Sequence, residues 1–220
     1  MEEDQGEGYR SSPYRRLQFH PHLPVSAPHV CSKSQVDTNP EAVVAVVGCG
    51  PVGLMAILAA RFLGAQRIVA IDSVPARLDL AKEFGAQPVS LDADPGTVIK
   101  TLTQGRGADV VLELVGGSAP LQLAFNLARP FGTLSSIGVH AETAAFPFTP
   151  AAMYDKNLTL RCGRCPARGT MPAALQVLRA PGLDPTRIIT HRVPLERAAE
   201  AYRMFDAKED RCIKVVFRVA

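Results

Sequence analysis

Three regularly spaced glycines are the first residues of this sequence whose pattern could do chemistry. Gly48, Gly50 and Gly53 form Gly-x-Gly-x-x-Gly after an apolar, β-branched run and before an amphipathic stretch. In that context the glycines permit a tight turn, a close approach of the backbone to a pyrophosphate, and close helix–strand packing. A helix starting here would also offer free N–H groups to an anion. The pattern predicts a dinucleotide pyrophosphate site; the alternative is a tight turn that binds nothing.

An acidic residue follows at the spacing that a ribose contact would need. Asp72 ends the next apolar run, 19 residues after Gly53, and such an acid hydrogen-bonds the adenosine ribose and repels a 2′-phosphate. This favours NAD(H) over NADP(H). Arg77 is the counter-argument, because its guanidinium could contact either ribose hydroxyls or a phosphate. Asp72 could also, or instead, cap the helix that Pro75 begins.

Glycines also follow two later runs that are typical of strands. Gly116 and Gly117 close one of these runs, and Gly138 closes the other. In an open α/β sheet the ligand lies along the carboxyl ends of the strands. Gly116 and Gly138 are therefore predicted to keep a cleft open, whereas Gly117 is equally compatible with a simple turn.

The elements that must position these residues alternate along the chain. We expect strands at 43–47, 67–71, 88–91, 110–114, 133–137 and 158–162, and helices at 52–64, 75–84, 95–104, 119–128 and 170–180. This alternation predicts an α/β fold with a Rossmann-type, doubly wound parallel sheet. Residues 1–40, rich in Pro and Ser without a sustained period, are expected to be a disordered or extended tail. Residues 41–180 form the predicted NAD-binding domain, and 181–220 a C-terminal segment with a helix at about 194–205.

Composition excludes several classes of partner. The formal charge of +3 comes from interspersed residues rather than a basic block, so no nucleic-acid or membrane-surface footprint is expected. The longest apolar stretch is interrupted by Gly-Cys-Gly-Pro and Arg61, which argues against a membrane span. The acidic N-terminus does not look like a targeting peptide, which favours a cytoplasmic location. Five cysteines, an odd number, favour free thiols.

These stretches together resemble one enzyme family. VVAVVGCGPVGLMAILAARFLGA, IVAIDSVPARLDLAKEFGA, GADVVLELVGG, GTLSSIGVH and NLTLRCGRCPARG resemble the cofactor-binding half of the medium-chain, zinc-type alcohol dehydrogenases. Within that family the sequence is most similar to the branch with formaldehyde and threonine dehydrogenases. The resemblance covers about Glu41 to Val219.

The resemblance implies a role for each matching position. The NAD pyrophosphate would lie at Gly48, Gly50, Pro51, Val52 and Gly53, the adenosine ribose at Asp72 and Arg77, the adenine side at Val115 and Gly116, and the nicotinamide at Ile137, Gly138 and Val139. Lys214 matches a basic position near the pyrophosphate, although it could equally be an outward-facing charge on an alternating strand.

The family's catalytic zinc domain has no counterpart in this sequence. About forty residues precede the predicted sheet, and they contain none of the family's zinc-ligand motifs. No metal site is therefore expected, and no catalytic residue can be assigned. Cys162 and Cys165 are predicted to be free thiols and Cys49 a packing residue. His140 is either a loop histidine or part of a zinc-independent proton relay.

The sequence thus predicts an NAD(H)-binding module of a zinc-type alcohol or aldehyde dehydrogenase-like oxidoreductase, without the catalytic zinc domain. The alternatives are a non-enzymatic NAD(H)-binding sensor or interaction protein, and an oxidoreductase that is active only with a separate catalytic chain. A homodimer is also compatible with the family resemblance, through the strand expected near 158–162. In the C-terminal segment, we expect Ile188, Ile189, Leu195 and Tyr202 to be partly exposed.

Overall fold

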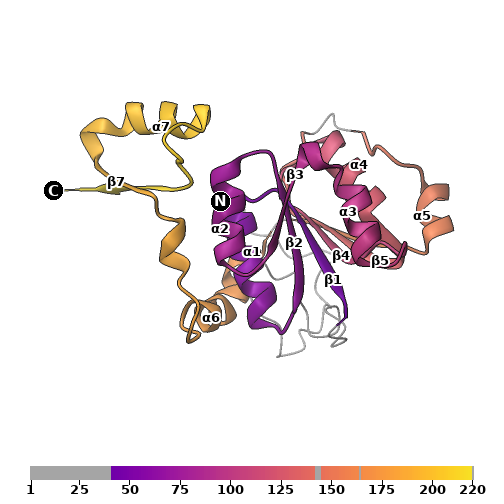
Figure 1. Cartoon of the computed structure of the whole chain (residues 1–220). Coiled ribbons are helices and arrows are strands. Elements are labelled where there is room, and N and C mark those ends of the chain that lie inside the picture. Colours follow the sequence, from indigo (N-terminus) through magenta and orange to yellow (C-terminus); the bar gives the residue numbers. More distant parts are fainter. Residues whose placement is uncertain (1–40, 142–144, 164, 220) are drawn as a thin grey trace, which may run out of the picture.

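A computed structural model describes residues 41–141, 145–163 and 165–219, so the tail predicted at 1–40 lies outside the described residues. Six parallel strands form one sheet in the order β3-β2-β1-β4-β5-β6 (Figure 1). They are β1 (Val43–Val47), β2 (Arg67–Asp72), β3 (Gln87–Ser90), β4 (Ala108–Glu113), β5 (Ala128–Ser136) and β6 (Thr159–Cys162). The order reverses between β1 and β4, which confirms the predicted doubly wound sheet and places a crevice at their carboxyl ends.

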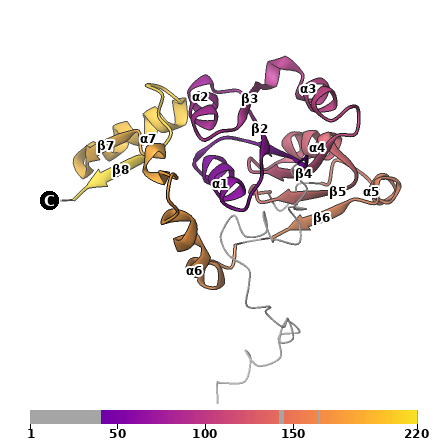
Figure 2. The ribbon, with the colours of Figure 1, turned by 60° about the horizontal axis from the view of Figure 1, so that its bottom comes forward.

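Helices cover both faces of this sheet. They are α1 (Pro51–Phe62), α2 (Pro75–Glu83), α3 (Pro95–Leu102), α4 (Ser118–Leu127), α5 (Pro150–Lys156) and α6 (Ala167–Leu178), with a short 3₁₀ turn, η1 (Leu91–Ala93). Figure 1 shows α1 and α2 on one face and α3 and α4 on the other. Figure 2 shows α6 beside α1. No helix in the described part of the chain is long and apolar enough to cross a membrane.

The core consists of two apolar layers that meet at the central strand. Val44 and Val46 face the layer that contains α1, α2 and α6, whereas Val43, Ala45 and Val47 face the layer that contains α3 and α4. Every residue of β1 is buried. A continuous apolar run of this kind is typical of a parallel strand covered on both faces.

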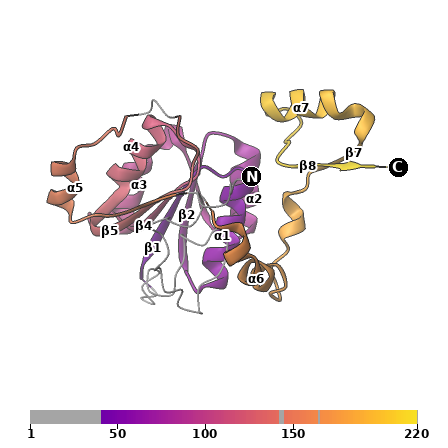
Figure 3. The same ribbon diagram turned by 180° about the vertical axis from the view of Figure 1, so that it is seen from behind.

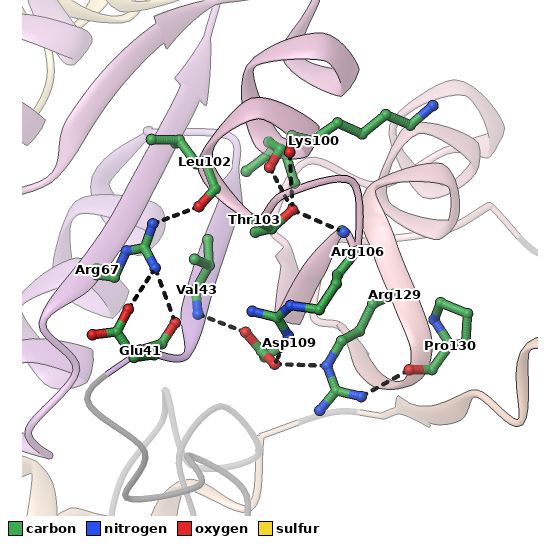
Figure 4. Close-up of polar contacts among 12 residues, drawn as sticks. Glu41, Val43, Arg67, Lys100, Leu102, Thr103, Arg106, Asp109, Arg129 and Pro130 are labelled. Carbon is green, nitrogen blue, oxygen red and sulfur yellow. Dashed lines mark hydrogen bonds and ion pairs between the residues drawn. The ribbon is translucent and has the colours of Figure 1, made fainter.

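A polar network joins the amino ends of the strands, at the end of the sheet opposite the crevice (Figure 4). Asp109 accepts a hydrogen bond from the Val43 N–H at 2.7 Å and one from Arg129 Nε at 2.6 Å. Arg67 donates to the Leu102 carbonyl at 2.6 Å. These contacts join the start of β1 to β4 and β5, and the start of β2 to the end of α3.

Residues 181–219 make a small unit at the end of the described chain, and Ile213 of this unit is buried in the core layer of α1 and α2. The unit contains the 3₁₀ turns η2 (Pro185–Ile188) and η3 (Leu195–Arg197), the parallel strands β7 (His191–Pro194) and β8 (Val215–Arg218), and α7 (Ala198–Ala207). Figures 1 and 3 show this unit projecting beyond α2. Two ion pairs link the unit to α2: Arg211 with Asp79 at 2.8 Å, and Arg187 with Glu83.

Two elements differ from the sequence expectation. α5 was not predicted, because its seven residues are too few to show an amphipathic period. The helix is defined by its caps instead: the Thr149 hydroxyl accepts a hydrogen bond from the Ala152 N–H, and Asn157 ends the helix in a left-handed conformation. β5 begins at Ala128, earlier than predicted, and its pairing with β4 shifts register between Ala108 and Val110. Its early part contains Pro130 and Gly132, which are typical of turns.

Candidate cofactor-binding site

The glycine turn between β1 and α1 is tightly packed at two of its three glycines. Gly48 has φ +93°, and its N–H donates to the Ile71 carbonyl at 2.8 Å. A Cβ on Gly48 would lie 2.5 Å from Val115 Cγ2, and one on Gly53 would lie 1.9 Å from the Gly48 carbonyl oxygen. Side chains therefore cannot fit at either position, in agreement with the tight turn and close helix approach that the pattern predicts.

Gly50 is different, because the space beside it is open. A Cβ at this position would meet no atom within 4 Å, and Gly50 is the N-cap of α1 with φ −64°. The first turn of α1 carries no acidic residue, and the N–H groups of Val52 and Gly53 lie where a helix has no internal acceptor. An anion could therefore approach the backbone here without displacing a side chain.

Asp72 ties the glycine turn to the end of β2. One carboxylate oxygen accepts the Cys49 N–H at 2.7 Å and the other accepts the Val74 N–H at 2.8 Å. The side chain is buried, and Arg77 Nη1 lies 3.6 Å from it. Val74 is itself the N-cap of α2 and has no side-chain cap, so the predicted alternative, in which Asp72 caps this helix, is wrong.

Arg77 carries an unsatisfied donor beside Asp72. Its side chain is 16 % exposed, and its Nε is buried with no hydrogen-bond partner among the described residues. Buried donors without a partner are uncommon in folded proteins. A hydroxyl or phosphate oxygen bound at the end of β2 would provide the missing acceptor.

The second wall of the crevice comes from the turns after β4 and β5. A Cβ on Gly116 would lie 2.1 Å from the Val139 carbonyl oxygen, and one on Gly138 would lie 2.1 Å from Gly116 N. These glycines therefore let the two turns touch each other, which differs from the predicted role of holding the cleft open. Val115 and Val139 are 54 % and 89 % exposed, so they could contact a ligand.

A buried polar network beneath this wall was not predicted from the sequence. Glu113 is fully buried, and one of its oxygens accepts the N–H groups of Val115 at 2.8 Å and Gly116 at 2.6 Å. Its other oxygen accepts the Ser136 hydroxyl at 2.7 Å. His140 Nε2 lies 2.8 Å from Ser136 Oγ, and its Nδ1 accepts the Gly117 N–H at 3.2 Å. The sequence signal for this network was Glu113 itself, a glutamate directly after the apolar run Val110 to Leu112.

These contacts do not make a nucleophilic triad. In such a triad the carboxylate accepts the histidine Nδ1–H, and the imidazole accepts the serine proton at Nε2. Here Nδ1 accepts a backbone N–H, and the hydroxyl of Ser136 donates to Glu113. His140 is therefore more than the simple loop histidine that was one of the two predictions, since it holds the backbone of Gly117.

Cys49, Cys162 and Cys165 match their predicted state, whereas Cys31 lies outside the described residues. Cys49 is buried, and desolvation, with a smaller contribution from the nearby Asp72 carboxylate, raises its pKa to about 12. Cys162 and Cys165 are exposed free thiols. Among the described residues, no group of three or more His, Cys, Asp or Glu side chains could hold a metal ion.

Lys214 lies in the C-terminal unit, just before β8. Its carbonyl accepts the Thr190 N–H at 3.0 Å, and the residue lines an apolar hollow of about 330 Å³ together with Tyr202 and Phe217. Lys214 is exposed, as expected for an outward-facing charge. Leu195 and Tyr202 are 47 % and 71 % exposed, and Ile188 and Ile189 are half-buried, as the sequence predicted for this segment.

The strand order, its reversal beside β1 and the glycine turn define the Rossmann-type class of α/β folds. A family model described as "Zinc-binding dehydrogenase" matches residues 51–180. Zinc-type alcohol dehydrogenase B of Aspergillus flavus is 41 % identical over 181 residues, which are 81 % of this chain and 41 % of that protein.

Solved structures give the same result. Alcohol dehydrogenase TADH from Thermus sp. ATN1 has a TM-score of 0.72 and 40 % identity, covering 83 % of this chain and 52 % of that one. A short chain alcohol dehydrogenase from E. coli CFT073, complexed with the cofactor NADH, has a TM-score of 0.69 at 20 % identity, covering 81 % of this chain and 52 % of that one, and shows the fold alone. The chain thus spans about half the length of its relatives. It belongs to the zinc-type alcohol dehydrogenase family and corresponds to the C-terminal, cofactor-binding part of these proteins.

Proposed function

We propose that this chain binds NAD(H) as the cofactor-binding domain of a zinc-type alcohol or aldehyde dehydrogenase-like oxidoreductase. The observation that carries the proposal is the open space at Gly50, at the start of α1, between two glycines that are closely packed. The unsatisfied Nε of Arg77 supports it independently. A structural relative that holds NADH at 20 % identity is consistent with it.

The bound dinucleotide would lie across the carboxyl ends of β1, β2, β4 and β5. Its pyrophosphate would contact the backbone from Gly48 to Gly53, including Pro51 and Val52, where the N-terminus of α1 favours negative charge. The adenosine ribose would lie at Asp72 and Arg77. Val115 and Gly116 would border the adenine side, and Ile137, Gly138 and Val139 the nicotinamide.

The geometry at Asp72 favours NAD(H) over NADP(H). Its carboxylate already accepts two backbone N–H groups, so the acid is held in place at the end of β2, where it would repel a 2′-phosphate. Arg77 does not offset this repulsion well, because its Nη1 lies 3.6 Å from the same carboxylate and its positive charge is already paired with Asp72. The remaining lone pairs of Asp72 can still accept ribose hydroxyls.

The bound nicotinamide supplies the hydride chemistry, and the residues of this chain bind and orient it. The backbone of the glycine turn holds the phosphates, Asp72 and Arg77 set the position of the ribose, and the paired turns after β4 and β5 form the wall beside the rings. No described residue is assigned as an acid, base or metal ligand for the reaction.

Titration of the purified chain with NADH and with NADPH, followed by nicotinamide fluorescence, tests the proposal, and the chain contains no tryptophan to interfere. We expect saturable NADH binding that is at least tenfold tighter than NADPH binding. Gly50→Asp should abolish binding, because its carboxylate would occupy the pyrophosphate position. The fold should survive, since this position is open and aspartate is a favoured N-cap.

Gly50→Ser is the matched control for this experiment. It places a side chain of similar size and capping ability at the same position without a charge, so it should weaken NADH binding less than Gly50→Asp does. Absence of NADH binding by a folded, unaltered chain would contradict the proposed function. Equal binding by the aspartate variant would contradict the placement of the pyrophosphate.

A further inference from the structure

The hydrogen bonds around His140 fix where its proton lies. The Gly117 N–H can only donate, so His140 Nδ1 must be the acceptor and carry no proton. The neutral ring then has its proton on Nε2, which points to Ser136 Oγ at 2.8 Å. Ser136 in turn donates its hydroxyl proton to Glu113 at 2.7 Å. The hydrogen bonds therefore run in one direction, from His140 to Ser136 and from Ser136 to Glu113.

This network holds three successive backbone amides of the turn after β4. Glu113 accepts the N–H groups of Val115 and Gly116, and His140 accepts that of Gly117. Gly116 and Gly117 have positive φ values of +92° and +86°, which glycine adopts without strain but which it does not prefer over other conformations, so the side-chain hydrogen bonds hold the turn in one shape. The turn is thus fixed by side chains from both β4 and the loop after β5.

The same turn contacts the glycine loop on the other side of the crevice. The space above the Gly48 Cα is filled by Val115 Cγ2, which would lie 2.5 Å from a Cβ there. A change in the Val115–Gly117 backbone would therefore move a side chain that packs on the proposed pyrophosphate site. His140 is 22 % exposed, whereas Glu113 is fully buried, so His140 can be changed with less damage to the core.

We propose that His140 is a positioning residue for the bound cofactor. It acts through Nδ1 as the acceptor that holds the Gly117 N–H and keeps the turn at residues 115–117 in the shape that borders the dinucleotide. This inference rests on the proposed NAD(H) binding. It requires an acceptor at the place of Nδ1 and requires the Nε2–H form of the neutral ring.

Two variants of the full chain separate this role from simple packing. In His140→Asn the amide oxygen takes approximately the place of Nδ1 and can still accept the Gly117 N–H, whereas His140→Leu is of similar size and has no acceptor. We expect His140→Leu to weaken NADH binding by about tenfold, the equivalent of one hydrogen bond. His140→Asn should stay within about threefold of the unaltered chain.

Nitrogen-15 NMR of the imidazole, and of the Gly117 amide, gives a readout that packing alone would not move. The expected result is a protonated Nε2 and a bare Nδ1, with a Gly117 amide that shifts in His140→Leu and is retained in His140→Asn. Equal NADH binding by the unaltered chain and His140→Leu, or a proton on Nδ1, would overturn the inference. Loss of binding in both variants to the same extent would also overturn it, while failure of the unaltered chain to bind NADH contradicts the proposed function itself.

Discussion

The three glycines of the turn after β1 have two different roles: Gly48 and Gly53 allow close packing, and Gly50 leaves open space. A Cβ at Gly53 would lie 1.9 Å from a backbone oxygen, whereas a Cβ at Gly50 would meet nothing within 4 Å. Gly53→Ala should therefore destabilise the protein by at least about 2 kcal/mol, as overpacking does in a close-packed interior. Gly50→Ala should change the free energy of unfolding little. Urea unfolding of the two variants measures this difference, and equal midpoints would contradict the packing described for α1.

Cys49 makes the stability of the protein depend on pH in the alkaline range. Its pKa is raised from 9.0 to about 12 in the folded state, so unfolding exposes a thiol that loses its proton more easily. The contribution of this group is fully present below pH 9 and is lost as pH rises toward 12. At pH 10 we expect a loss of the order of 1 kcal/mol relative to pH 8.

Cys49→Ala is the control, because it keeps a small apolar residue and removes the titrating group. Thermal unfolding of both proteins between pH 8 and pH 10 should show a steeper decline for the unaltered chain. Parallel declines would contradict burial of the Cys49 thiol. Alkylation at neutral pH gives a second readout, since Cys162 and Cys165 should react in the native state and Cys49 only after unfolding.

Residue types and spacing were enough to predict the glycine turn and an acid at the end of the next strand, because both belong to one recurring pattern of residue types at fixed spacing. The role of Glu113 depends on Ser136 and His140, which are 23 and 27 residues away. That contact exists only because β4 and β5 are neighbours in register, with Glu113 beside Ser136. No local pattern carries this information.

Among the strands, Asp109 holds the amino ends of β1, β4 and β5 together. This carboxylate is 11 % exposed and accepts the Val43 N–H and Arg129. Asp109→Ala would leave the N–H at the start of β1 without its partner, and we expect a loss of about 2–3 kcal/mol in the free energy of unfolding. Asp155→Ala, which removes an exposed carboxyl from α5, should change stability by less than about 0.5 kcal/mol.

This variant pair also tests whether the amino ends of the strands have a structural role only and the carboxyl ends bind the ligand. NADH affinity of the folded Asp109→Ala protein should remain within about twofold of the unaltered chain, because the network lies at the opposite ends of the strands. A large loss of affinity without a loss of stability would contradict that division.

The predicted strands and the predicted helices are all present, because long apolar runs and amphipathic periods are strong signals over this length. The start of β5 and the whole of α5 were not anticipated. Their residues, such as Pro130 and Thr149, have local preferences for turns and caps, and only pairing with β4 or packing against the sheet decides their final state.

For the whole molecule, the C-terminal unit contacts the main sheet in two ways: Ile213 is buried in the core layer that contains α1 and α2, and exposed ion pairs join the unit to α2. The Arg211–Asp79 pair is 69 % and 57 % exposed at its two side chains, and surface pairs of this kind contribute little. The unit also exposes Tyr202 and Phe205. We predict that the protein increases the fluorescence of a hydrophobic dye, and that Tyr202→Ser together with Phe205→Ser reduces this increase by about half or more.

Arg203→Ser on the same helix, α7, is the matched control, since Arg203 is exposed and not apolar. It should leave the dye signal unchanged. A folded chain that does not bind the dye would show that the apolar surface of this unit is covered in solution.

The doubly wound topology of the main sheet was predictable from the alternation of elements, whereas the parallel pairing of β7 with β8 was not, because these strands are short and far apart in the sequence.

Amide hydrogen exchange with and without saturating NADH reports directly on where the dinucleotide binds. We expect slower exchange at residues 48–54, 72–77, 115–117 and 137–140, which line the carboxyl ends of the strands, and no change around Asp109. Protection at the opposite edge of the sheet, or no protection anywhere at a concentration where NADH is bound, would contradict the proposed site.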